Sequence, residues 1–284
     1  LREALVHSRN LATVNLVYDI GVNTIRKRLA LLDVPNIPKD LSLSLGNVGI
    51  SPLKMAQMYT VFSNNGHMIE PRLVSKIISK ENAVLYETKP KEIANFTKPE
   101  QAYLMTDILK EVVQSGTGRN ARVKGLELAG KTGTTNDGVD AWFCGYSPTI
   151  TTITWFGRDN NRRIGKGATG GSIAAPSFAY FYRELLKLYP DTARKFIQPS
   201  GVFIGQTKDG KKELYTDISP LQNKKIEPVN PFDTLDEAID ESVEVININE
   251  DPISDVSDRD VVVDPINLKP KEPVKVGDDS GMMF

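Results

Sequence analysis

Four stretches of the chain place apolar residues three or four positions apart, the spacing of a helix with one buried face. The predicted helices cover residues 1–33, 52–63, 99–114 and 172–188. Gly21 is expected to separate two helices within the first stretch. Ser51 followed by Pro52 is a typical helix start, because a serine hydroxyl caps free N–H groups and proline fits the first turn.

Other stretches are rich in β-branched and aromatic residues and are separated by turn residues, which predicts strands. The predicted strands cover 72–79, 83–87, 127–134, 141–146, 150–158, 202–207 and 213–215. Glu81-Asn82 and Asp209-Gly210 lie at turns between neighbouring strands and predict two hairpins. Helices first, then a mostly antiparallel sheet, then another helix is the order of an α+β fold.

The charges divide the chain into two unlike parts. The 284 residues carry 35 Lys and Arg against 36 Asp and Glu, but residues 227–284 hold 16 of the acidic residues and only four basic ones. The net charge is therefore near +11 before residue 227 and near −12 after it. The acidic segment has few aromatic residues and recurrent prolines, so it buries too little apolar surface to offset its ordering entropy. We predict a globular domain over 1–226 and a disordered acidic tail over 227–284.

Composition narrows the chemistry. With 40% hydrophobic and 25% charged residues, the chain resembles a globular protein, not a collagen, a coiled coil or a disulfide-stapled miniprotein. It contains no apolar run of the roughly 18–20 residues that span a membrane. Cys144 is the single cysteine, and His7 and His67 are the two histidines. Cys-rich and His-rich metal sites are thus excluded, and we expect neither a metal nor a cofactor.

Lys131-Thr132-Gly133-Thr134 is the first candidate for chemistry, and it falls on a predicted strand. The N–H groups of a strand edge can stabilise a developing oxyanion, and hydroxyl and ammonium groups can hold a substrate carboxylate. Gly133 lacks a side chain that would keep a ligand backbone at a distance. The same residues also fit a solvent-exposed strand without function.

Ser8-Arg9-Asn10 is the second candidate, because it interrupts an apolar helical stretch. A serine hydroxyl can pass a proton, and an amide two positions later can orient a neighbouring group. Ser63-Asn64-Asn65 has the same pattern and fits a helix end, so the tripeptide alone is weak. A Ser-x-x-Lys nucleophile, a Ser-x-Asn element and Lys-Thr-Gly occur in that order in penicillin-binding proteins and class A β-lactamases.

Longer stretches around both motifs resemble the transpeptidase domain of class A penicillin-binding proteins. These stretches are residues 1–15, 49–66, 114–118, 130–148 and 170–178. The resemblance covers roughly residues 1–190 and leaves out the tail. It implies the α+β fold that these transpeptidases share with the serine β-lactamases, an antiparallel sheet flanked by helices.

The nucleophile of that family, the serine of Ser-x-x-Lys, should precede the Ser-x-Asn element. The one such motif in this chain, Ser51-Pro52-Leu53-Lys54, follows it, and helix capping already explains Ser51. The resemblance therefore implies a nucleophile upstream of Leu1 and a domain that is incomplete at its N-terminus. These residues alone are expected to be inactive and to need the upstream part of the same protein.

Carried onto matching positions, the resemblance implies a role for each residue. Ser8 would relay a proton, Asn10 would bind the peptide carbonyl of the substrate, and Lys131 would keep the Ser8 hydroxyl poised. Thr132 and Thr134 would bind the C-terminal carboxylate of a stem peptide or of a β-lactam. The Thr134 N–H would be one donor to the oxyanion.

The protein so implied is a bifunctional cell-wall synthase with a glycosyltransferase domain and a membrane anchor upstream. It would act on the outer face of the bacterial cytoplasmic membrane (the periplasm in a Gram-negative cell), joining D-Ala-D-Ala stem peptides of peptidoglycan by serine acyl transfer. A D,D-carboxypeptidase, a β-lactamase or a non-catalytic penicillin-recognising module would share the motifs. No nucleic-acid partner is expected, because Arg162, Arg163 and Lys166 fit a solvated turn.

Three nearby features are expected to be structural. Trp142 and Phe143 fit the core better than a substrate platform. Gly170-Gly171 should form a close-packed turn near the site. His7 should not pair with Ser8, because neighbours in sequence point to different sides of a helix.

Overall fold

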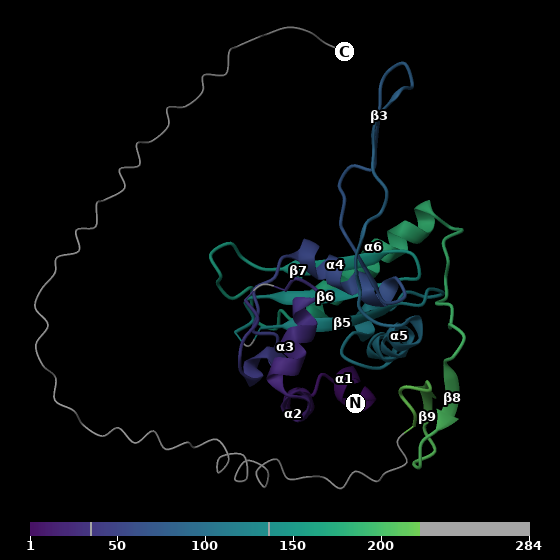
Figure 1. The fold of residues 1–284 in the computed structure, drawn as a ribbon. Helices are drawn as coiled ribbons and strands as arrows, with labels where there is room; N and C mark the ends of the chain where they lie inside the picture. The colour runs from purple at the N-terminus through teal and green to yellow at the C-terminus, as the bar shows by residue number, and fades with distance from the viewer. Residues whose placement is uncertain (35, 136, 222–284) are drawn as a thin grey trace, which may run out of the picture. The chain divides into compact units, whose positions relative to one another are not determined.

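The computed structural model describes residues 1–34, 36–135 and 137–221, and Figure 1 shows how their elements are arranged. The predicted boundary between residues 226 and 227 and the acidic tail lie outside these ranges, so both stay predictions. Within the same ranges, no helix is long and apolar enough to cross a bilayer.

An antiparallel sheet of three strands forms the centre of the fold. Its strands, in order, are β5 (Ala129–Thr134), β6 (Ala141–Tyr146) and β7 (Thr151–Phe156). They confirm the strands predicted at 127–134, 141–146 and 150–158. Because β6 lies in the middle, β5 is an edge strand within the part of the chain that the structure describes.

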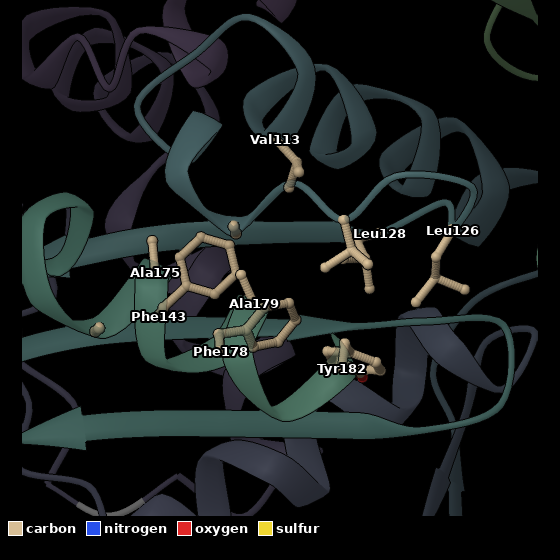
Figure 2. Close-up of a cluster of buried hydrophobic side chains, with 11 residues drawn as sticks. Val113, Leu126, Leu128, Phe143, Ala175, Phe178, Ala179 and Tyr182 are labelled. Carbon is tan, nitrogen blue, oxygen red and sulfur yellow. The ribbon is translucent and has the colours of Figure 1, made fainter. Parts of the chain in front are cut away.

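Helices pack on both faces of this sheet because β6 carries apolar side chains on both faces, as a central buried strand does. On one face, Phe143 packs against Phe178 of α6 (Ala175–Leu188), with 4.6 Å between ring centroids. Figure 2 shows the buried cluster around these two rings, which includes Tyr182. On the other face, Tyr146 packs against α4 (Pro52–Ser63) and α5 (Pro99–Gln114). Both helices confirm the predicted ranges.

Local sequence sets where the helices begin. The Ser51 hydroxyl accepts the N–H of Lys54 at 3.2 Å, which confirms the predicted cap of α4. The helix predicted over 172–188 starts two residues earlier, because a π-helical turn, η3 (Gly170–Ala174), leads into α6. The side chains of Thr169 and Ser172 cap this turn by accepting each other's backbone N–H.

The N-terminal residues are helical with one more break than the sequence predicted. The helices are α1 (Arg2–Val6), α2 (Asn10–Ile20) and α3 (Val22–Ala30). Gly21, at φ +87°, separates α2 from α3 as predicted. The unpredicted break at residues 7–9 has a tertiary cause, because the Val6 carbonyl accepts the N–H of Thr117 at 3.3 Å. Ser8 therefore lies between two helices and not on one.

Two hairpins stand where the sequence predicted them, and some short elements were missed. The hairpins pair β2 (Lys76–Ile78) with β3 (Val84–Glu87) and β8 (Phe203–Gln206) with β9 (Lys212–Tyr215). The missed elements are β1 (His67–Ile69) with its partner β4 (Glu92–Asn95), and the 3₁₀ helices η1 (Leu41–Leu45) and η2 (Arg119–Ala121). These segments are too short to show a periodic pattern of their own.

Phe178→Ala should lower the free energy of unfolding by about 3–5 kcal/mol, because the ring is fully buried against Phe143 and Tyr182. Urea unfolding followed by circular dichroism measures this loss. Tyr180→Ala on the exposed side of α6 is the control, with an expected change of no more than about 0.5 kcal/mol. Equal losses in the two variants would contradict this core.

Candidate active site

The two candidate motifs meet although 123 positions separate their residues. The Nζ of Lys131 donates to the Oγ of Ser8 at 2.8 Å and to the carbonyl of Thr132 at 3.0 Å. An ammonium and a hydroxyl at this distance can exchange a proton. The structure thus brings Ser8 and Lys131 together, while the roles assigned to them stay predictions.

A strained backbone presents Ser8. Its φ of +54° lies in the left-handed region, which costs a residue with a side chain roughly 1–2 kcal/mol. Neighbouring residues hold the preceding turn of chain in place. A Cβ on Gly116 would lie 2.4 Å from the carbonyl oxygen of Val6, so only glycine allows this approach. The next residue, Thr117, donates its N–H to the same carbonyl.

Lys131 lies in a sheltered position. It pairs with Cys144 in the β5–β6 register. Burial lowers the pKa of Lys131 below its ordinary value, and the charge of an ionised Cys144 would oppose that shift. A lysine with a lowered pKa releases its proton more readily near neutral pH, so this side chain is suited to exchanging a proton with Ser8.

Thr132 and Thr134 alternate with Lys131 along β5, so their side chains leave the opposite face of the strand. The Oγ1 of Thr132 lies 2.8 Å from the Oγ1 of Thr117. The Oγ1 of Thr134 accepts the N–H of Gly170 at 3.0 Å, which leaves its own hydrogen free to donate. This face therefore offers hydroxyl donors, which suit a carboxylate ligand.

Among the described residues, no strand pairs with the outer edge of β5, and this free edge carries the Thr134 N–H. Thr135 donates its N–H to the carbonyl of Asp140, its partner on the β6 side. Backbone groups of successive residues alternate between the two edges of an antiparallel strand. The N–H of Thr134 therefore points away from β6, where a ligand carbonyl could accept it.

Glycines allow a close approach between β5 and η3. A Cβ on Gly170 would lie 2.2 Å from the Trp142 carbonyl oxygen and 2.6 Å from that of Gly133. The expected close-packed turn beside the Lys-Thr-Gly strand is thus present. A Cβ on Gly133 would lie 3.2 Å from the Cβ of Trp142, so the absent side chain at 133 also allows packing within the sheet.

Asn10 lies two residues after Ser8, beyond the break between α1 and α2. It is the first residue of α2 and is exposed. Among the described residues, its side chain makes no hydrogen bond, so its predicted contact with the substrate stays a prediction.

Two alternative sites have structural explanations. Lys54 of the Ser51-x-x-Lys54 motif pairs with Asp33 at 3.0 Å, while Ser51 caps α4. His7 pairs through its Nδ1 with Glu3, one turn back on α1, at 3.1 Å. Neither contact forms a nucleophile–base pair.

The aromatic residues beside the site agree in part with the sequence. Phe143 is fully buried, as predicted, whereas Trp142 is half-buried beside Trp155, with 5.8 Å between ring centroids. The indole N–H of Trp155 donates to Asp140 at 2.8 Å and fixes the turn after β5.

Thr117 is the site residue for which the sequence predicted no role. The signal was a Gly-Thr-Gly run after an amphipathic helix, within the stretch 114–118 that resembles the family. In the described ranges, no group of three or more His, Cys, Asp and Glu side chains could hold a metal ion.

The chain is similar to several known proteins. The family model described as "Penicillin binding protein transpeptidase domain" matches residues 1–183. Penicillin-binding protein 1A of Aquifex aeolicus (strain VF5) is 37% identical over 191 residues, which cover 67% of this chain and 26% of that protein. Penicillin-binding protein 1A of Neisseria lactamica is 33% identical over 220 residues, covering 75% of this chain and 27% of that protein. The chain thus spans about a quarter of the length of these relatives.

Solved structures share the fold. Penicillin-binding protein 1A of Haemophilus influenzae matches 80% of this chain and 41% of its own, with a TM-score of 0.70 and 23% identity. The PonA1 protein of Mycobacterium tuberculosis, in complex with penicillin V, matches 70% of this chain and 59% of its own, with a TM-score of 0.59 and 20% identity. The predicted fold class is confirmed.

Cys144 should resist thiol reagents in the native protein. Burial raises the pKa of its thiol to about 12, so the reactive thiolate is scarce at pH 8. We expect no reaction with a disulfide reagent at pH 8 until urea unfolds the chain, measured by the absorbance of the released thiolate. Ser115→Cys introduces an exposed thiol as a positive control and should react at once. Equally fast reaction of Cys144 in the native wild type would contradict its burial.

Proposed function

The chain belongs to the penicillin-binding protein transpeptidase family, and from that membership we propose that it is the C-terminal part of a peptidoglycan D,D-transpeptidase. The observation that carries the proposal is the 2.8 Å contact between Lys131 Nζ and Ser8 Oγ beside the free edge of β5. A proton relay and unpaired N–H donors are what serine acyl transfer requires around its nucleophile.

The reaction proceeds in two acyl transfers. The hydroxyl of a serine upstream of Leu1 attacks the carbonyl between the two D-alanines of a stem peptide. An ester bond forms, the peptide bond breaks, and the terminal D-Ala leaves as an amine. An amine on the stem peptide of a neighbouring peptidoglycan strand then attacks the ester, which restores the serine hydroxyl and forms the cross-link.

Ser8 relays the proton in both transfers. Ser8 passes the proton of the attacking hydroxyl to the leaving nitrogen, and the Lys131 ammonium keeps the Ser8 oxygen oriented. In the second transfer, Ser8 passes the proton of the attacking amine to the oxygen of the upstream serine. Asn10, at the start of α2, binds the peptide carbonyl of the stem.

Residues of β5 bind the substrate. An extended stem peptide lies along the free edge of β5, as an added strand would. Its terminal carboxylate accepts hydrogen bonds from the hydroxyls of Thr132 and Thr134. The Thr134 N–H donates to the carbonyl oxygen as it becomes an oxyanion. β-Lactams carry a carboxylate and a reactive carbonyl and act as inhibitors at the same groups; the complex of the PonA1 protein with penicillin V supports this.

The longer protein is bifunctional, with a glycosyltransferase domain and a membrane anchor upstream of Leu1. Its transpeptidase works outside the cytoplasmic membrane, in the periplasm if the cell is Gram-negative. This chain spans only about a quarter of the penicillin-binding protein 1A relatives that it matches, which leaves room for such parts in the longer protein.

Fluorescent penicillin should label the longer protein at a serine before Leu1. It should not label the isolated chain of 284 residues. Ser8→Ala and Lys131→Ala in the longer protein should each slow acylation by about 100-fold or more, because proton transfer is impaired. In-gel fluorescence over time measures the rate. Ser51→Ala is the control and should label at the wild-type rate. Labelling of the 284 residues at Ser51 would overturn the assignment.

The longer protein, supplied with lipid-linked disaccharide pentapeptide, should make cross-linked muropeptide dimers, detected by chromatography and mass spectrometry. Release of D-Ala without dimers would identify a carboxypeptidase instead. Hydrolysis of the fluorescent penicillin would identify a β-lactamase. Binding of penicillin without any turnover would identify a recognition module.

A further inference from the structure

α1 (Arg2–Val6) leads directly to Ser8. Its contacts with the rest of the fold therefore bear on where the Ser8 hydroxyl lies.

Three carboxylates surround the guanidinium of Arg2 at the start of α1. The Nη2 bonds Asp107 at 2.7 Å and the Nη1 bonds Glu111 at 2.9 Å, both on α5. The Nε lies 2.8 Å from each carboxylate oxygen of Glu213 on β9, and the Nη2 also contacts Glu213. The Arg2 side chain is only 20% exposed, so these pairs are less screened than surface pairs.

The hairpin that supplies Glu213 is itself fixed to α5. The Nε2 of Gln101 donates to the Oγ1 of Thr216 at 2.7 Å, and Ser219 donates to the Oε1 of Gln101 at 2.9 Å. Glu213 lies beyond residue 183, where the family match ends. A segment outside the residues that the family model matches therefore contacts α1, the helix that leads to Ser8.

The other end of α1 is fixed as well. Val6 is buried, and its carbonyl binds the Thr117 N–H. Two residues later, Ser8 adopts its left-handed backbone, a conformation that persists only where the surroundings hold it. Contacts at both ends of α1 thus set the position of the Ser8 hydroxyl at Lys131.

We propose that Glu213 is a positioning residue of the active site. Through Arg2 it fixes α1, so that the Ser8 Oγ stays within hydrogen-bond distance of Lys131 Nζ. The β8–β9 hairpin is therefore a working part of the catalytic unit. This inference rests on the proposed function, because it assigns Glu213 to the proton relay of that same site.

Glu213→Gln, made in the longer protein that carries the upstream serine, tests the proposal. Asp107 and Glu111 remain as partners for Arg2, so we expect this variant to fold, while Arg2 loses its charge pair with β9. The acylation rate constant with fluorescent penicillin should fall about tenfold while the initial binding constant stays unchanged, since a misplaced catalytic group slows the chemical step. Glu213→Asp should recover part of the rate. Glu184→Gln, which removes the exposed ion pair with Lys187, is the matched control and should leave the rate unchanged.

A double variant separates positioning from general stability. If Glu213 acts through Ser8, Glu213→Gln should cause no further loss in a Ser8→Ala background. Losses that multiply, or a wild-type rate in Glu213→Gln alone, would overturn the proposal.

Amide hydrogen exchange tests whether Glu213 holds α1 in place, without an activity measurement. The N–H groups of Ser8 and Arg9 donate to the carbonyls of Leu5 and Ala4. In Glu213→Gln these amides should exchange about tenfold faster, with no change in the amides of β6. Unchanged exchange at Ser8 and Arg9 would also overturn the proposal. Absence of penicillin labelling in the wild type would refute the proposed function, and the exchange measurement would still decide the role of Glu213.

Discussion

The pairing of β5 with the doubly buried strand β6 is the constraint on which the site depends. The register sets Lys131 opposite Cys144 and Thr132 opposite Phe143, on the two faces of the sheet. A slip of one residue would exchange these faces, and the packing of helices on both sides of β6 prevents it. Lys131 can reach Ser8 only because this register holds.

Elements with a pattern of their own could be predicted from the sequence. α4 and α5 follow apolar spacing and begin with proline at the first turn, so both ranges were predicted correctly. The three central strands were predicted because they contain β-branched and aromatic residues and because turn residues lie between them. The Lys-Thr-Gly strand was found by its residue types, and its edge position follows from the topology.

Contacts between distant residues could not be predicted in the same way. The break before α2 depends on the hydrogen bond from the Thr117 N–H to the Val6 carbonyl, and no residue near Val6 in the sequence predicts that bond. The pairing of β1 with β4 is equally non-local. The ion pair of Glu213 with Arg2 could not be predicted either, because no pattern around a glutamate on a short hairpin indicates its partner.

The hydroxyl pair of Thr117 and Thr132 has a consequence for affinity. Each hydroxyl carries one hydrogen and can also accept, so the bond between the two Oγ1 atoms can run in either direction. A carboxylate only accepts, so a ligand bound to Thr132 would require Thr132 to donate outward and Thr117 to donate to Thr132. The loss of one of two orientations disfavours binding through entropy. The aligned chain of donors favours binding, because each hydrogen bond polarises the next.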